Sequence, residues 1–308
     1  MPLTFRKLHP LFAAEVGPID LPSVYDEETL AEIRRGMDEF GVLVFHDQAF
    51  TDEMQLAFAQ RFGGELHSRT GSSVIAKSRL GNEALSDISN IDENGDILDS
   101  EDRRRMYNLG NRLWHTDASF QDPAGRYSLL SARVVPPVAA DTEFADMRAA
   151  YDALPPETKA EIDGLYAHHS IAHSRRTLGF EFSQDEEDRL KGAIHPLVRT
   201  IPGSGRKSLY IASHASRIVD WPVPDGRLLL LDLRDHATQP QFRYRHSWRV
   251  GDLVIWDNRA TMHRGVPFED TKYPRELRRV TTLDTDPEPL AAAGMLSARS
   301  APGTTRPV

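Results

Sequence analysis

The first half of the chain contains two segments whose apolar residues repeat with the period of a helix. In residues 26–41, DEETLAEIRRGMDEFG, the apolar side chains share one face, and Gly41 is a typical helix end. In residues 51–64, TDEMQLAFAQRFGG, Thr51 is a suitable N-cap, and the helix should end at Gly63. Its large apolar residues repeat every four positions: Met54, Phe58 and Phe62. Between the two predicted helices, VLVFHDQAF indicates a buried strand.

From residue 127 onward the pattern changes to short apolar runs bounded by turn residues, which are typical of strands. The predicted strands are YSLLSARVV, TEFADM, KSLYIAS, HSWRVGDLVIWDN and RRVTTLD, with helices beginning near residue 148 and over 225–238. SWRV and DLVIWD, on either side of Gly251 and Asp252, predict a hairpin, and GSGRK at 203–207 predicts a second hairpin turn rather than a phosphate-binding loop.

Strands separated by turns, with helices mainly early and as insertions, predict a mainly β fold with helical padding, in which two antiparallel sheets form a barrel. Residues 64–112 are polar and irregular and should form a mobile excursion, and residues 286–308 lack periodicity and should form a loose tail. One catalytic domain over 1–308 is the simplest organisation.

Composition narrows the chemistry. The formal net charge of −9 argues against a nucleic-acid partner, which requires a basic surface. The absence of cysteine excludes disulfides, zinc–thiolate sites and thiol catalysis, so any metal must be held by nitrogen and oxygen. No stretch approaches the roughly 20 apolar residues of a membrane span, and the N-terminus does not resemble a secretory signal, so a cytoplasmic protein is expected.

One short motif suggests a metal site. In LWHTDASF, His115 and Asp117 would project from the same face if residues 113–117 were extended. Such a pattern alone is weak, and a hydrogen-bonded surface pair is the simpler alternative. His263, at the end of the strand-like run VIWDNRATMH, could be a third ligand. Two histidines and a carboxylate form the facial triad of non-haem Fe(II) oxygenases, which leaves coordination sites open.

A second feature fits the same chemistry. The open sites of a facial triad can accept a chelating 2-oxo acid and dioxygen, and a 2-oxo diacid also needs a cation for its far carboxylate. Arg275 follows His263 by twelve residues and could pair that carboxylate bidentately. Arg278 lies close enough in the sequence to be the alternative.

With these residues, the chain resembles the Fe(II)/2-oxoglutarate-dependent dioxygenases of the taurine and 2,4-dichlorophenoxyacetate dioxygenase family, and most nearly the 2,4-dichlorophenoxyacetate branch. The similarity runs collinearly through LHPLFAAEVGPIDL, LSDISN, GNRLWHTDASFQDPAGRYSLLSARVVPP, DTEFADMRAAYDALP, GSGRKSLYIASHAS, DHATQPQF, GDLVIWDNRATMHRG and RELRRVTTLD. It covers nearly the whole chain short of the tail and implies a double-stranded β-helix, the jelly roll of cupin-like proteins.

The resemblance also implies roles for individual residues. His115, Asp117 and His263 match the iron ligands. Thr142 and Arg275 match the residues that hold the co-substrate, 2-oxoglutarate. Arg279 matches the arginine that binds the anionic group of the primary substrate, although it could instead stabilise the barrel by pairing with an acidic neighbour. Two more positions match the pocket, although both could be packing residues: Asn111 near the substrate and Trp256 in the wall beside the iron.

The implied reaction consumes 2-oxoglutarate and O2 and hydroxylates a small carboxylate substrate. An aryloxyacetate such as 2,4-dichlorophenoxyacetate would yield a phenol and glyoxylate, with succinate and CO2, in the catabolism of aromatic compounds. The alternatives are the same mechanism acting on taurine, an alkyl sulfate or another small organic acid, a metal-dependent jelly-roll hydrolase, and a binding module. A homo-oligomer is compatible with the sequence.

HHSIAH is a rival metal motif, in which His169 and His173 would share a helix face. Ser170 stands where a zinc protease would need glutamate. Ordinary polar or pocket-lining histidines are the simpler interpretation of this motif.

Overall fold

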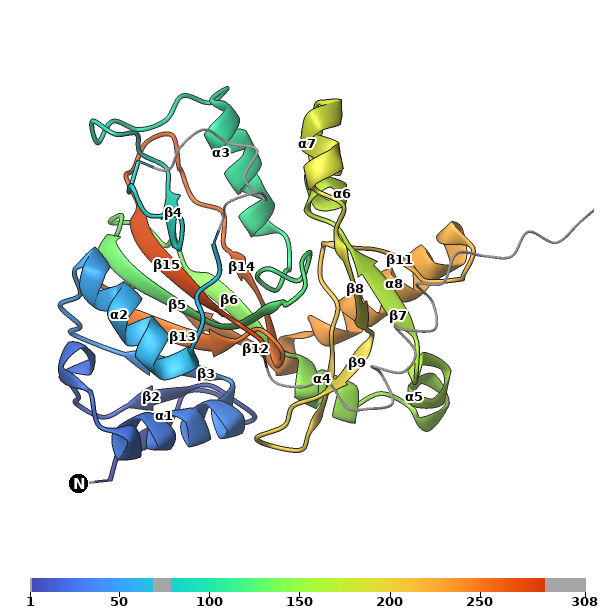
Figure 1. The fold of residues 1–308 in the computed structure, drawn as a ribbon, viewed down its shortest axis with the longest axis horizontal. Helices are drawn as coiled ribbons and strands as arrows, with labels where there is room; N and C mark the ends of the chain where they lie inside the picture. Colours follow the sequence, from blue (N-terminus) through green and yellow to red (C-terminus); the bar gives the residue numbers. More distant parts are fainter. Residues whose placement is uncertain (1, 69–78, 286–308) are drawn as a thin grey trace, which may run out of the picture.

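The computed structural model describes residues 2–68 and 79–285. Its largest element is a seven-stranded sheet (Figure 1). In spatial order the strands are β1 (Phe5–Lys7), β2 (Ala14–Val16), β3 (Val42–Phe45), β13 (Leu253–Asp257), β5 (Gly125–Val134), β15 (Glu276–Leu283) and β4 (Leu85–Ser89). All neighbours are antiparallel except β2 and β3.

A second sheet of three antiparallel strands packs against the inner face of the first. Its order is β12 (Arg243–His246), β6 (Thr142–Asp146) and β14 (Thr261–Gly265). Apolar side chains fill the space between the two sheets, among them Leu130, Phe144, Trp248, Trp256 and Leu277. Three of the predicted site residues lie on strands that border this core: Thr142 on β6, His263 on β14 and Arg279 on β15.

Helices cover the outer face of the large sheet (Figure 1). They are α1 (Glu27–Phe40) and α2 (Asp52–Gly63), which pack on β3, β5, β13 and β15. The predicted cap of α2 is confirmed, because the side chain of Thr51 accepts a hydrogen bond from the backbone N–H of Met54. At the start of α1, the side chain of Asp26 accepts a hydrogen bond from the backbone N–H of Thr29. Gly41 ends α1 with φ of 70°, a left-handed conformation that glycine adopts without a steric penalty.

The remaining strands and most of the remaining helices form a second region beside the two sheets (Figure 1). The other short helices line the cavity or pack on α2. The strands are β7 (Tyr166–His169), β8 (Ala193–Pro196), β9 (Val198–Thr200), β10 (Lys207–Leu209) and β11 (Ala215–Ile218). The helices are α3 (Arg103–Asn108), α4 (Met147–Asp152), α5 (Pro156–Ile162), α6 (Ile171–Arg176), α7 (Gln184–Arg189) and α8 (Val223–Ala237), with short 3-10 helices η1 (Leu21–Ser23), η2 (Leu109–Arg112) and η3 (Pro240–Phe242).

Two local expectations are wrong in ways that have a physical reason. Met54 is 46% exposed, and the neighbouring Gln55 is buried in its place. The Gln55 amide donates hydrogen bonds to the carbonyls of Leu129 and Arg278, so a polar side chain ties α2 to the sheet. The described part of the excursion, 64–68 and 79–112, also contains more regular structure than expected, because β4 pairs with the edge of β15 and α3 follows it.

The predicted hairpin around Gly251 does not form. β12 pairs with β6, whereas β13 pairs with β3 and β5, so the intervening turn carries the chain from one sheet to the other. The Asp252 carboxylate holds this turn by accepting a hydrogen bond from the backbone N–H of Arg249 and contacting His246 on β12. The predicted turn at 203–207 is confirmed, since it joins the antiparallel pair β9 and β10.

Helical and extended segments occupy similar shares of the described residues, so the fold is rich in sheet with helices on its faces rather than mainly β. Within those residues, no helix has the length and apolar character needed to cross a membrane. The predicted loose tail, 286–308, lies outside the described residues.

Candidate active site

His115, Asp117 and His263 converge although 148 residues separate the first from the last. Nε2 of His115 lies 3.9 Å from Oδ1 of Asp117, and Nε2 of His263 lies 3.8 Å from Oδ2. One donor atom from each side chain lies within 4.8 Å of the others, and all three residues are buried. Over the described ranges, this is the one group of three histidine or acidic side chains with such spacing.

A backbone bridge places the two histidines opposite each other. The N–H of His115 donates to the carbonyl of His263 at 3.0 Å, and the reverse bond is 2.8 Å long. His263 is held in β14, opposite Phe144 of β6. The expected extension over 113–117 is confined to this bridge, because a turn begins at Asp117. The carboxylate therefore reaches the histidines from a turn rather than from a strand face.

Asn258 holds that turn in place. Its side-chain oxygen accepts hydrogen bonds from the backbone N–H of Asp117 at 2.9 Å and from Nε1 of Trp256 at 3.0 Å. Its amide nitrogen donates to Ser128 Oγ, which in turn donates to Asp117 Oδ2 at 2.7 Å. Our sequence analysis did not single out Asn258. The available signal was the pair Asp257–Asn258, two polar residues directly after the apolar run LVIW.

The protonation states suit metal binding. Nδ1 of His115 donates to the carbonyl of Leu113 at 2.7 Å, which leaves a lone pair on Nε2. Burial lowers the pKa of His115 to about 4, so its imidazole is neutral at pH 7. Burial alone would raise the pKa of Asp117, but Arg279 and the two histidines outweigh it and lower that pKa to about 2. Neutral imidazoles and an ionised carboxylate are the forms that ligate metals.

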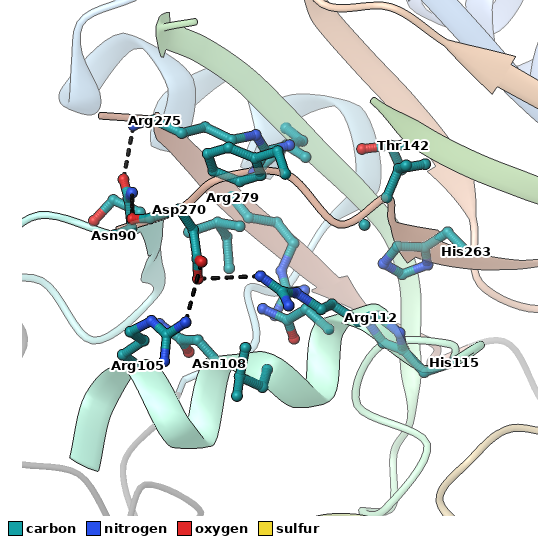
Figure 2. Close-up of a pocket in the computed structure, with 18 of the residues that line it drawn as sticks. Asn90, Arg105, Asn108, Arg112, His115, Thr142, His263, Asp270, Arg275 and Arg279 are labelled. Carbon is teal, nitrogen blue, oxygen red and sulfur yellow. Dashed lines mark hydrogen bonds and ion pairs between the residues drawn. The ribbon is translucent and has the colours of Figure 1, made fainter. Parts of the chain in front are cut away.

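A cavity of about 880 Å³ opens on this cluster (Figure 2). Both histidines line it, and so do the other positions expected near the co-substrate or substrate: Asn111, Thr142, Trp256, Arg275 and Arg279. The structure thus brings together every predicted site residue, with Asp117 adjoining the cavity through its contacts to His115 and His263.

Arg275 and Arg278 differ sharply in their surroundings. Arg275 lines the cavity, and within 2–68 and 79–285 no carboxylate forms an ion pair with its guanidinium. Burial lowers the pKa of Arg275 to about 10, against a weaker raising effect of Asp141. Arg278 lies on the opposite face of β15, where its guanidinium pairs with Asp87 at 3.2 Å and with Glu276. Arg275 is therefore the arginine available to an anion in the cavity.

Thr142 and Trp256 form part of the cavity wall. Nε1 of Trp248 donates to Thr142 Oγ1 at 3.0 Å, so the hydroxyl hydrogen of Thr142 remains available to another acceptor. The ring of Trp256 is fully buried, and its centre lies 4.6 Å from that of His263. Trp256 therefore fixes the orientation of His263 by packing as well as lining the cavity.

Arg279 forms an ion pair with Asp117, which is the alternative that the sequence left open. The rest of its guanidinium is not saturated, because Nε is buried without a hydrogen-bond partner. Arg279 shares the inner face of β15 with Leu277, whereas Arg278 and Val280 point outward. Its position allows it to contact both Asp117 and a ligand in the cavity.

At the mouth of the cavity, Asp270 bridges two arginines (Figure 2). Its carboxylate lies 3.1 Å from Arg105 of α3 and 3.1 Å from Arg112 of η2. The loop between β14 and β15 is thereby attached to the segment that carries Asn111. No sequence signal singled out this contact, because it joins two irregular segments.

A second cavity of about 710 Å³ adjoins the first and includes Asp117. His214 and Arg175 line it, and the sequence analysis gave neither a role. The rival motif does not form a helical metal pair, because His169 ends β7 whereas His173 lies in α6.

Residues 4–281 match the family model described as Taurine catabolism dioxygenase TauD, TfdA family. The chain belongs to the TauD/TfdA dioxygenase family. This membership confirms the expected resemblance and the expected enzyme class, an oxidoreductase. It also agrees with the geometry, since the matched range contains the ligand cluster and the two arginines that the resemblance singled out, Arg275 and Arg279.

Several relatives of this TauD/TfdA chain have assigned activities. Alpha-ketoglutarate-dependent 2,4-dichlorophenoxyacetate dioxygenase of Cupriavidus pinatubonensis is 48% identical over 285 residues, which cover 92% of this chain and 99% of the relative. (S)-phenoxypropionate/alpha-ketoglutarate-dioxygenase of Sphingobium herbicidovorans is 35% identical over 270 residues, which cover 85% of this chain and 88% of the relative. The crystal structure of AAD-2 in complex with Mn(II) and N-oxalylglycine is 47% identical, with a TM-score of 0.89, and covers 94% of this chain and 100% of that chain.

Proposed function

We propose that the protein is an Fe(II)- and 2-oxoglutarate-dependent dioxygenase that hydroxylates an aryloxyalkanoate. The observation that carries this proposal is the cavity in which His115 and His263 face an arginine, Arg275, that has no acidic partner among the described residues. A hydrolase has no use for such a cation beside its metal. The activities named for the relatives at 48% and 35% identity support the substrate class.

The residues present fit a divalent metal. His115, Asp117 and His263 would hold it through two Nε2 atoms and one carboxylate oxygen, a donor set without thiolate that suits Fe(II) in oxygenases. When bound, the iron supplies the oxidising power of the reaction with O2. The protein's own share is to keep both imidazoles neutral, to hold Asp117 through Asn258 and Ser128, and to exclude water.

For 2-oxoglutarate, we assign Arg275 and Thr142 to the distal carboxylate. The guanidinium offers a planar pair of donors, and the Thr142 hydroxyl can donate because Trp248 occupies its acceptor side. The Mn(II) and N-oxalylglycine in the similar AAD-2 structure support 2-oxoglutarate as the co-substrate, because N-oxalylglycine is 2-oxoglutarate with one methylene replaced by NH.

For the primary substrate, we assign Arg279 to the carboxylate, with Asn111 beside it and Trp256 in the wall near the metal. Hydroxylation of the carbon between the carboxylate and the ether oxygen produces a hemiacetal, which collapses to a phenol and glyoxylate. The balance is one aryloxyacetate, one 2-oxoglutarate and one O2 converted to phenol, glyoxylate, succinate and CO2. Related family members that act on taurine or alkyl sulfates share this mechanism with a different anion.

We further propose that the two sheets are the walls of a double-stranded β-helix and that the chain is one catalytic unit. The pairing of β12, β6 and β14 opposite the large sheet supports this description. The cytoplasmic location and a homo-oligomer stay predictions.

The test is a substrate panel scored by succinate formation with Fe(II), 2-oxoglutarate and O2. It should contain aryloxyacetates, aryloxypropionates, arylacetates, taurine and alkyl sulfates, with Asp117→Ala as the inactive control. We expect succinate to rise with aryloxyacetates, with one phenol released per succinate. Stimulation by taurine or alkyl sulfates alone would move the protein to another branch of the family. No succinate with any member would contradict the dioxygenase assignment.

A further inference from the structure

The second cavity is a chamber on the metal-ligand cluster that adjoins the one holding Arg275 and Thr142. The two cavities share five lining residues, Ile88, Asn108, Asn111, His115 and Arg279, but the second includes Asp117 and neither of the co-substrate residues. Part of its lining is apolar: Ile88, Ala118, Phe120 and Ile171. A ligand in this chamber can therefore approach the metal position while 2-oxoglutarate keeps its own contacts.

Arg175 of α6 is a buried cation in the wall of this chamber. The residue is 5% exposed, and its one short polar contact is a 3.4 Å hydrogen bond from Nη1 to Ser174 Oγ. Its Nε is buried with no hydrogen-bond partner, and no carboxylate in the described part of the chain forms an ion pair with it. Buried charges in proteins are normally paired, because desolvation of an isolated charge costs several kcal/mol. An arginine in this state is a receptor for an anion.

The surroundings of Arg175 hold its guanidinium in place. It lies over the ring of Tyr107, 4.6 Å from the ring centre. On another side it packs against the backbone of Gly110, where an added Cβ would come within 2.1 Å of Nη1. Gly110 directly precedes Asn111, so the same short helix carries a residue of both cavities and the surface that supports Arg175.

The acids around the chamber are already paired with other arginines. Asp117 pairs with Arg279, and Asp87 pairs with Arg79 and Arg278. Burial lowers the pKa of Arg175, Tyr107 opposes this effect, and Arg279 lies near enough to lower the pKa further. Two neighbouring cations that repel each other bind an added carboxylate favourably, because its two oxygens can accept hydrogen bonds from both guanidinium groups.

We propose that Arg175 is a specificity-determining residue of this chamber and binds the anionic group of the primary substrate together with Arg279. This inference rests on the proposed function and refines it, since it assigns the substrate's carboxylate to a pair of arginines and its apolar part to the chamber wall. Arg175 selects anions over neutral molecules of the same shape.

The experiment measures binding rather than turnover. Anaerobic protein loaded with Mn(II) and 2-oxoglutarate is titrated calorimetrically with phenoxyacetate and with neutral phenoxyacetamide. We expect Arg175→Gln to weaken phenoxyacetate binding at least about tenfold, and phenoxyacetamide binding less than about twofold. Arg175→Lys should restore part of the difference. Arg176→Gln is the matched control, because Arg176 is the next residue of α6 but pairs with Glu187 on the surface; it should bind both probes as the wild type does.

Gly110→Ala provides a second test that keeps the charge. The added methyl displaces the guanidinium, so it should reproduce the acid-selective loss if Arg175→Gln does not fold. Equal weakening of acid and amide in the two variants would mean that Arg175 acts by packing and would overturn the proposal. Unchanged phenoxyacetate affinity in Arg175→Gln would also overturn the proposal, when the wild-type enzyme turns over aryloxyacetates. Wild-type protein that binds phenoxyacetate through Arg175 yet forms no succinate from the panel would instead overturn the proposed function alone.

Discussion

Replacement of Arg275 by glutamine tests which arginine holds 2-oxoglutarate. The guanidinium lines the first cavity without an acidic partner among the described residues, and a pKa of about 10 keeps it charged at pH 7. Glutamine preserves one donor and most of the side-chain length but removes the charge. The expected change is therefore the loss of one charge-assisted pair with the distal carboxylate, with little effect on the primary substrate.

The size of the effect follows from the burial of this pair. Removal of one partner of a buried charge pair costs roughly 2–5 kcal/mol, and each 1.4 kcal/mol or so is a factor of ten in affinity. The Thr142 hydroxyl remains to hold the carboxylate, so we expect the lower part of that range. The KM for 2-oxoglutarate should rise about 30-fold to 100-fold.

The assay is steady-state succinate formation with 2-oxoglutarate varied at saturating aryloxyacetate, and then the reverse. Arg278→Gln is the matched control, because Arg278 lies three residues away but pairs with Asp87 and Glu276 on the outer face of β15. It should lower the free energy of unfolding while leaving the KM for 2-oxoglutarate within about twofold. An unchanged KM in Arg275→Gln, with a large rise in Arg278→Gln, would refute the reasoning.

Four further predictions follow from the site. Asp117→Ala should abolish stoichiometric binding of Mn(II) or Fe(II), measured by calorimetry under anaerobic conditions; retention of one tightly bound ion would contradict the assigned ligand set. Asn258→Ala should weaken metal affinity about 10-fold to 100-fold and lower the melting temperature, because it removes the acceptor for the backbone N–H of Asp117. A variant that lost stability but kept wild-type metal affinity would limit Asn258 to a folding role. Arg279→Leu should lose turnover of the carboxylate substrate by two or more orders of magnitude while 2-oxoglutarate still binds, and near-normal turnover of an aryloxyacetate would reject the assignment. The metal-free protein should lose stability as the pH falls from 7 to 5, by roughly 2 kcal/mol for each of His115 and His195, as measured by urea unfolding. The sign is set by the folded-state pKa of about 4 for both histidines, which is below the usual histidine pKa of about 6.5, so the unfolded chain binds more protons in this window. Equal stability at both pH values would contradict this prediction.

The sequence by itself determined the features that depend on neighbours a few residues away. The cap Thr51 of α2 and the end of α1 at Gly41 were predictable because a cap bonds to backbone within one turn. The shared face of Arg275 and Arg279 was predictable because side chains alternate along a strand. The ligand set was predictable from residue chemistry and from the family resemblance, since an H-x-D pair needs one further histidine to complete a facial triad.

Only the tertiary structure decided which partners meet across the fold. Arg278 differs from Arg275 because β4 brings Asp87 to the outer face of β15, a contact between residues 191 positions apart. The failed hairpin at Gly251 has the same origin, because the pairing of β12 with β6 outcompetes its pairing with β13. Arg175 belongs to the site only because α6 packs against the segment that holds Tyr107 and Gly110. Such contacts depend on the burial of large, distant surfaces, which no local pattern of polar and apolar residues encodes.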